Sequence, residues 1–157
     1  MTDLTFVPWV EPIAGRLAQS TQEIEQVARD IPEDAWSEPS AYPGWSYKDH
    51  LSHLPESYRG LQSVLGAVIE GRDPDFSRFD RIDEINEENR QKHLATPVVE
   101  LLDSMAAEGQ QIQQLLSELG PEDADNRLGP MTLSQALQGF TMHDVAHLEE
   151  LKEGLQA

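Results

Sequence analysis

The sequence predicts an all-α protein, a four-helix bundle with a long crossover connection between the second and third bundle helices. Apolar residues recur at three- and four-residue spacing through four long segments, which indicates helices with one buried face. Aromatic residues make up only 6% of the chain, and the periodic segments are too long for typical strands. Residues 72–80 show no periodicity and exceed the length of a tight turn, so they predict the crossover.

We expect one domain over residues 1–157, because this length buries a substantial core and no linker or repeat divides the chain. The first helix is predicted over residues 9–29, with Pro12 in its first turn. Its buried face consists of Ile13, Leu17, Thr21, Ile24 and Ala28. Residues 31–45, rich in proline, serine and acidic residues, predict an ordered loop that carries Trp36.

The second helix has a well-marked start. Ser46 follows Pro-Gly-Trp, and Asp49 comes three residues later, which is the spacing of a capping box with a shorter acid. The helix is expected to end near Gly71. Its apolar stripe consists of Leu51, Leu54, Tyr58, Leu61, Leu65 and Val68.

Three further helical segments follow. Residues 81–94 predict a polar helix, and Thr96 and Pro97 then predict the N-cap and first residue of the next helix. The buried face of that next helix consists of Leu101, Leu102, Met105, Ile112, Leu115, Leu116 and Leu119. Thr132 and Gln135 form another capping box that opens the last helix. Its buried face consists of Leu133, Leu137, Phe140, Leu148 and Leu151.

Composition excludes several classes of function. The chain has no cysteine, so disulfides, thiolate metal sites and a cysteine nucleophile are excluded. The net charge of −18, with three lysines in all, argues against binding to nucleic acid or to an anionic membrane surface. No apolar run is long enough for a membrane span, and the N-terminus lacks a secretory signal, so we expect a cytoplasmic protein.

The histidines are the residues best suited to chemistry. His143 and His147 lie one turn apart on the last helix, at the margin of its buried stripe, where a side chain reaches both the interior and water. Imidazole pairs of this kind bind zinc, nickel or iron when a facing helix supplies a third ligand. The second helix offers His50 or His53 for this role, and periodicity does not decide between them. His93 is expected to be solvated.

Other polar and aromatic residues have less specific expectations. Asp49 is needed as a helix cap, whereas Asp144 and Glu149 are expected to be solvated helix acids, the alternative being that one of them orients a metal ligand from behind. Asn86 and Asn89 are expected to be ordinary polar surface, the alternative being that they line the mouth of a cavity. The aromatic residues expected to belong to the core are Trp45, Tyr58 and Phe140.

Two motifs resemble those of a known family. Residues 31–54 combine a tryptophan in the first loop, Pro-Gly-Trp-Ser at 43–46 and a His-Leu pair beginning at His53. Together with the closing His-x-x-x-His of His143 and His147, this pattern is similar to the DinB-like superfamily, especially the branch of mycothiol-dependent maleylpyruvate isomerases. The resemblance assigns the metal ligands to His53, His143 and His147. In that branch the middle ligand is commonly a carboxylate, whereas this chain has a histidine.

The resemblance implies a DinB/YfiT-like fold and a divalent metal ion, zinc or nickel, held by three histidines. It further implies a thiol-dependent transferase or a hydrolase in detoxification or stress response, acting on a small-molecule substrate. A low-molecular-weight thiol such as mycothiol would be the cosubstrate, and a homodimer is expected. No general base is predicted from the residues. The alternative is a non-catalytic metal-binding or structural helical module, acting as a dimer.

Overall fold

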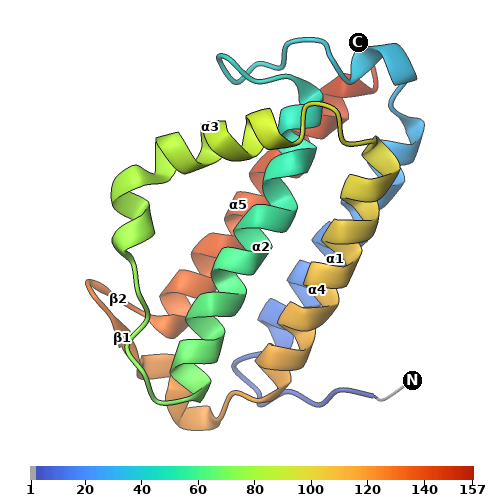
Figure 1. Cartoon of the computed structure of the whole chain (residues 1–157). Coiled ribbons are helices and arrows are strands. Elements are labelled where there is room, and N and C mark those ends of the chain that lie inside the picture. Colours follow the sequence, from blue (N-terminus) through green and yellow to red (C-terminus); the bar gives the residue numbers. More distant parts are fainter. Residues whose placement is uncertain (1–2) are drawn as a thin grey trace.

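Four long helices run along the length of the molecule, and a shorter helix lies across one of them (Figure 1). The computed structural model describes residues 3–157, so residues 1 and 2 of the predicted 1–157 domain lie outside the described residues. The long helices are α1 (Glu11–Asp30), α2 (Tyr47–Ile69), α4 (Val98–Ser117) and α5 (Leu133–Gly154), and the shorter one is α3 (Ile82–Lys92). The all-α prediction is confirmed.

Each long helix packs against two others. Both α1 and α2 contact α4 and α5, so the four apolar faces meet in one core. Helix α1 runs parallel to α5, and α2 runs parallel to α4 (Figure 1). Residues 70–97 make the second arrangement possible, because they carry the chain from the end of α2 back to the opposite end of the molecule before α4 begins. The antiparallel contact of α2 with α5 positions the site described below.

The predicted apolar stripes form the core. Eight leucines of these stripes have no more than 2% exposure, as do four other residues of the stripes: Leu51, Leu54, Leu65, Leu101, Leu116, Leu133, Leu137 and Leu151, with Ile24, Tyr58, Met105 and Ile112. Thr21, Val68, Leu102, Leu115 and Phe140 were expected on the same faces and are only partly buried. Burial of apolar surface at the i, i+3 and i+4 positions therefore stabilises the association of the four helices.

Both predicted capping boxes are confirmed. The Ser46 hydroxyl accepts a hydrogen bond from the Asp49 amide at 3.3 Å, and the Asp49 carboxylate accepts one from the Ser46 amide at 2.8 Å. Thr132 and Gln135 make the same reciprocal pair at the start of α5. The expected start of α4 was wrong by one residue: Pro97 is the N-cap, and the Thr96 hydroxyl instead contacts His93.

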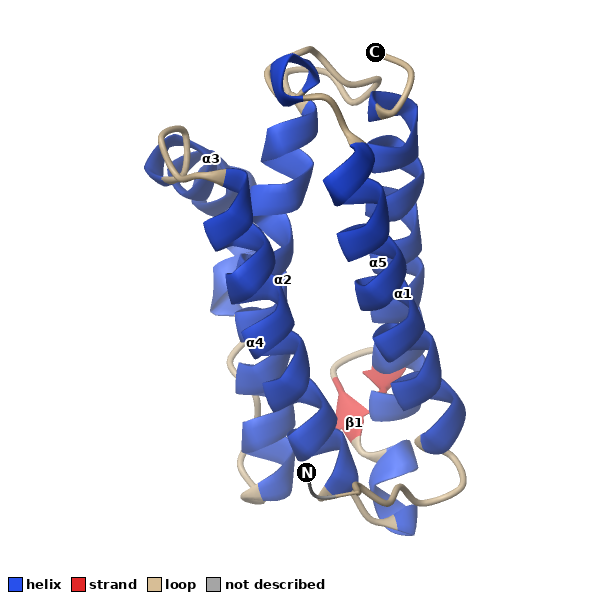
Figure 2. Ribbon diagram, turned by 90° about the vertical axis from the view of Figure 1, so that its right-hand side faces the viewer, coloured by secondary structure: helices blue, strands red, loops and turns tan. Residues whose placement is uncertain are grey.

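The connections contain short pieces of structure. A 3-10 turn at Glu33–Ala35 lies in the first loop, and another at Ser77–Arg81 precedes α3. Between α4 and α5, a third turn at Pro121–Asp125 leads into a small antiparallel hairpin, β1 (Arg127–Leu128) and β2 (Met131–Thr132), near one end of the molecule (Figure 2). None of the helices within residues 3–157 has the length and apolar character needed to cross a membrane.

Candidate metal centre

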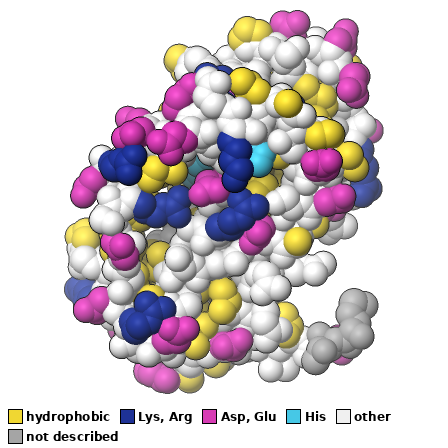
Figure 3. Space-filling model, in the orientation of Figure 1, with side chains coloured by type: hydrophobic (Ala, Val, Ile, Leu, Met, Phe, Trp, Pro, Cys, Tyr) yellow, Lys and Arg dark blue, Asp and Glu magenta, His cyan; other side chains and the backbone are white. Residues whose placement is uncertain are grey.

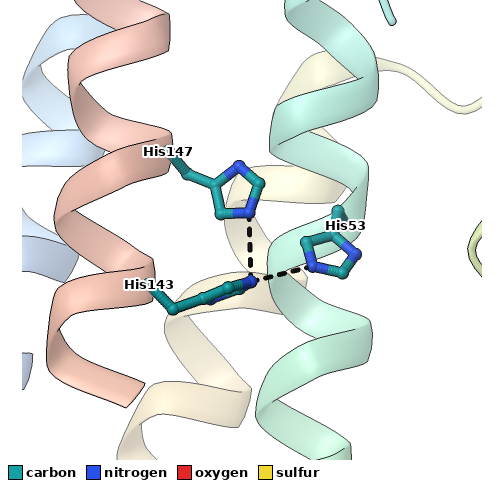
Figure 4. A group of neighbouring side chains, drawn as sticks. All are labelled: His53, His143 and His147. Carbon is teal, nitrogen blue, oxygen red and sulfur yellow. Dashed lines mark hydrogen bonds between the residues drawn. The ribbon is translucent and has the colours of Figure 1, made fainter. Parts of the chain in front are cut away.

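Helices α2 and α5 face each other and bring three histidines together (Figure 4). His53 projects from α2, whereas His143 and His147 project from α5 one turn apart. The Nε2 atom of His143 lies 3.1 Å from Nε2 of His53 and 3.1 Å from Nε2 of His147. The structure therefore brings together the three residues that the resemblance assigns as metal ligands.

The spacing of these three nitrogens fits a metal ion. Two nitrogens bound tetrahedrally to zinc at about 2.0–2.1 Å lie roughly 3.3 Å apart. The contacts of 3.1 Å from His143 to its two neighbours come close to that value. One candidate ligand atom from each of the three residues lies within 4.8 Å of the others. The three histidines therefore form a group that could hold a metal ion.

Burial keeps two of these rings, those of His53 and His147, in the neutral form that metal ligands require. It lowers the pKa of His53 to about 4, with further lowering by His143, His50 and Arg78. Burial likewise lowers the pKa of His147 to about 2, again assisted by neighbouring histidines. Both rings are thus uncharged near neutral pH, and each has a lone pair available for coordination.

The side chain of His143 is 37% exposed, so the group of histidines meets solvent on this side. Behind it lies Asp144, which is fully buried and accepts a hydrogen bond from the Tyr58 hydroxyl at 2.6 Å. The other carboxylate oxygen of Asp144 lies 3.7 Å from Nδ1 of His143. Both Nδ1 of His143 and this Oδ1 of Asp144 are buried, and neither has a hydrogen-bond partner among the described residues. The expectation of a solvated acid is wrong for Asp144, which is buried beside His143, whereas Glu149 is exposed and pairs with Lys152.

The second histidine of α2 does not join the three. His50 is buried, and its Nδ1 lies 2.9 Å from Nδ1 of His147. Of His50 and His53, between which periodicity did not decide, His53 is the one that lies in the three-histidine group. His93 lies elsewhere, partly buried rather than solvated, with its Nδ1 at 3.1 Å from the Thr96 hydroxyl.

Trp45 was expected in the core, and that expectation was wrong. Its half-buried ring stacks on His147 at 6.2 Å between ring centroids and 15° between planes, and it lies 5.4 Å from the ring of His53. The indole therefore covers the histidines and limits the access of water. The sequence indicates that Trp45 lies near the start of the helix that carries His53, because Trp45 immediately precedes the N-cap Ser46.

The asparagines of α3 do not form a cavity mouth. Asn89 is buried and donates a hydrogen bond from its amide to the Ser52 carbonyl at 3.1 Å, which attaches α3 to α2. Asn86 is partly buried. A polar side chain of α3, that of Asn89, thus attaches this helix to α2.

Comparison with known proteins identifies the family. The family model described as the DinB superfamily matches residues 16–151, which include both histidine-bearing helices. No curated protein and no solved structure matches the chain. The match covers most of the sequence and agrees with the motifs around His53 and His143. The chain belongs to the DinB superfamily.

Proposed function

We propose that this protein is a metal-dependent enzyme that binds one divalent ion, zinc or nickel, through Nε2 of His53, His143 and His147. The observation that carries the proposal is the convergence of these three nitrogens, with 3.1 Å contacts, from two separate helices. We further propose that α1, α2, α4 and α5 are the four-helix bundle of the family, with residues 70–97 as its crossover connection.

The ligand set favours a reactive site over a closed structural one. Structural zinc sites are usually completed by four protein ligands, whereas catalytic sites commonly have three and keep a position open. The group found among the described residues contains three histidines, and the side chain of His143 is partly exposed. A divalent ion held in this way supplies Lewis-acid chemistry and lowers the pKa of a water or thiol that binds at the open position.

The surrounding residues support that chemistry. Asp144, held by Tyr58, lies behind His143 and has a carboxylate oxygen 3.7 Å from its Nδ1. A carboxylate in this place favours the ring form whose Nε2 is free to coordinate. Trp45 covers His53 and His147, which lowers the local dielectric and strengthens electrostatic effects at the site. We propose a thiol-dependent transfer or a hydrolysis of a small-molecule substrate, with a low-molecular-weight thiol as cosubstrate for the former, in detoxification or stress response.

Metal content tests the first part of the proposal. Purified wild-type protein is expected to hold about one equivalent of zinc or nickel after dialysis, since three imidazoles on a fixed scaffold bind these ions tightly. His53→Ala is expected to lose the metal while keeping its helical circular dichroism. His93→Ala, which removes a histidine outside the site, is the matched control and is expected to keep it. Equal metal content in all three proteins would contradict the three-histidine site.

Turnover tests the second part. Metal-loaded protein is expected to accelerate either the thiol-dependent consumption of an electrophile or the hydrolysis of a member of an ester panel. His53→Ala and chelator-treated wild type are expected to lose this activity. If the loaded protein turns over neither class of substrate, the enzymatic part of the proposal fails and a metal-binding module without catalysis is favoured.

A further inference from the structure

A chain of hydrogen bonds, formed by Ser40, His50 and His147, lies behind the candidate metal ligand His147. We propose that His50 is a positioning residue for the metal centre: it accepts a hydrogen bond from Nδ1 of His147 and so holds that ring in the tautomer whose Nε2 is free to coordinate. This inference rests on the proposed metal site and adds a residue that neither the family match nor the three-histidine group assigns.

The geometry of the chain is well defined. His50 is 1% exposed, so its ring nitrogens are shielded from solvent and need partners within the protein. Its Nδ1 lies 2.9 Å from Nδ1 of His147, and its Nε2 lies 2.9 Å from the Ser40 hydroxyl. Each ring nitrogen of His50 thus has one partner at hydrogen-bond distance.

The direction of the chain follows from its far end. The Ser40 hydroxyl lies 2.9 Å from the Trp45 carbonyl, which it reaches as a donor, and it accepts a hydrogen bond from the Tyr42 amide at 3.2 Å. With its single hydrogen on that carbonyl, the hydroxyl acts as an acceptor toward His50, and in the arrangement we propose Nε2 of His50 carries the proton and donates to it. A neutral imidazole has one such proton. Its Nδ1 is left with a lone pair.

The proton on His147 is placed by the same reasoning. Since Nδ1 of His50 is an acceptor, the contact of 2.9 Å requires that Nδ1 of His147 carry the proton and donate. Nε2 of His147 then has a free lone pair, and this is the nitrogen that faces Nε2 of His143 at 3.1 Å. This order of protons depends on no metal ion, and it leaves Nε2 of His147 unprotonated and free to coordinate.

The chain also joins the metal site to the loop before α2. It ends on the carbonyl of Trp45, whose own ring stacks on His147. The spacing of His50 and His53 has a physical meaning in this arrangement, because residues three apart point to neighbouring sides of a helix. His53 is directed into the site, and His50 supports His147, which comes from the opposite helix.

Two substitutions at position 50 separate support of His147 from simple packing. Nδ1 of histidine lies two bonds from Cβ, as does the amide oxygen of asparagine, whereas Nε2 lies three bonds from Cβ, as does the amide group of glutamine. His50→Asn therefore keeps an acceptor for His147 and loses the contact with Ser40. His50→Gln keeps the contact with Ser40 and loses the acceptor. His50→Leu loses both.

Metal affinity, measured by competition with a chelating indicator for Zn²⁺ alone, is the first readout. His50→Gln and His50→Leu are expected to weaken zinc binding about 10- to 100-fold, the usual effect of losing a partner that orients a ligand. His50→Asn is expected to stay within a few-fold of wild type. Equal losses in the Asn and Gln variants, or wild-type affinity in His50→Leu, would overturn the proposal. If wild-type protein itself binds no zinc, the proposed function fails instead.

The tautomers of the wild-type protein provide a second readout that does not depend on how any variant folds. Long-range ¹H–¹⁵N spectra of the zinc-loaded protein are expected to show His50 protonated at Nε2 and His147 protonated at Nδ1. Protonation of His50 at Nδ1 would reverse the hydrogen bond to His147 and overturn the inference, even if zinc is bound at full stoichiometry.

Discussion

Tyr58 and Asp144 form a buried polar pair between α2 and α5. Both side chains are almost inaccessible, and the Tyr58 hydroxyl donates to the carboxylate at 2.6 Å while lying 3.3 Å from the Thr21 hydroxyl. Burial first, and then the neighbouring carboxylate, raises the pKa of Tyr58 above its ordinary value, so the phenol stays protonated and remains a donor. A buried carboxylate without such a donor is strongly unfavourable. The pair therefore fixes Asp144 directly behind His143.

Replacing this donor tests its contribution. Tyr58→Phe is expected to lower the free energy of unfolding of the metal-free protein by about 1–3 kcal/mol, because Asp144 would lose its hydrogen bond inside the core. Urea unfolding followed by circular dichroism measures the change. Tyr42→Phe removes a hydroxyl from a side chain that is 53% exposed and is the matched control, expected to behave as wild type. Equal stability of the two variants would contradict the role of the pair.

At the residue scale, the sequence predicted which histidines belong together only through the family motif. Spacing alone placed His143 and His147 on one helix face and left His50 and His53 as alternatives. Both residues of α2 contact α5: His53 lies beside His143, and His50 lies beside His147. Periodicity cannot distinguish these positions, because the distinction depends on how α2 is rotated against its neighbour. The position of Trp45 was missed for the same reason.

At the scale of the elements, α3 depends on polar contacts with α2. It has little apolar surface of its own, and Asn89 is its buried residue. Besides the hydrogen bond from Asn89 to the Ser52 carbonyl, Arg90 pairs with Asp49 at 3.4 Å. Beyond α3, the Lys48 ammonium donates to the Leu94 carbonyl at 2.8 Å. These contacts hold α3 across the beginning of α2, close to the turn that carries His53.

Loss of the central contact is expected to loosen α3 selectively. Asn89→Ala is expected to raise amide hydrogen exchange in residues 82–92 at least several-fold, since the helix then lacks its one buried anchor, and short polar helices are marginal by themselves. Exchange in α1 is expected to stay as in wild type. Asn86→Ala, one turn earlier on the same helix, is the control. Global loss of protection in Asn89→Ala would show that α3 belongs to the folding core and would refute the expectation.

Helix ends were more predictable than helix partners. The reciprocal contacts at Ser46 and Thr132 depend on residues three apart, so local sequence contains all the information. The start of α4 was misplaced by one residue because Thr96 has a competing partner in His93, and that contact arises from the turn between α3 and α4. Pro55 lies inside α2 without ending it, since the helix is supported on several sides by tertiary packing.

At the scale of the whole molecule, charge is distributed so that most arginines on one face have acidic partners. Figure 3 shows Lys and Arg side chains with Asp and Glu beside them over the face formed by α2 and α3. Arg59 pairs with Glu56 and Glu108, and Arg78 pairs with Glu56. With a net charge of −18, such paired cations offer little attraction to a polyanion. The prediction that the protein does not bind nucleic acid therefore keeps its physical basis.

The buried histidines make the stability of the metal-free protein dependent on pH. Burial lowers the pKa values of His50 and His53 from 6.5 to about 4 and that of His147 to about 2. Below pH 6.5 the unfolded chain binds protons that the folded chain does not, so the free energy of unfolding is expected to fall as the pH is lowered from about 6.5 to about 4. Urea midpoints of chelator-treated protein measure the trend.

The matched variant for this trend is His53→Leu, which removes one of the buried bases. Its stability is expected to fall less steeply over the same pH interval. A flat profile in wild type, or an identical slope in the variant, would contradict the assignment of these rings as buried and neutral.

The relative placement of the helices could not be predicted from the sequence alone. The apolar stripes indicate which side of each helix is buried, but they do not indicate which helix it faces. The site requires α2 and α5 to be antiparallel neighbours, with His53 beside His143 although 90 residues separate them in the sequence. This pairing follows from packing of the whole core and became visible only in three dimensions.

The central claim is that three imidazoles from α2 and α5 hold one metal ion, and anomalous X-ray scattering from a crystal grown without added metal tests it most directly. The account predicts a single strong peak at the zinc or nickel absorption edge, about 2.0–2.2 Å from Nε2 of His53, His143 and His147. The absence of a peak there, or a peak held by surface carboxylates instead, would contradict it.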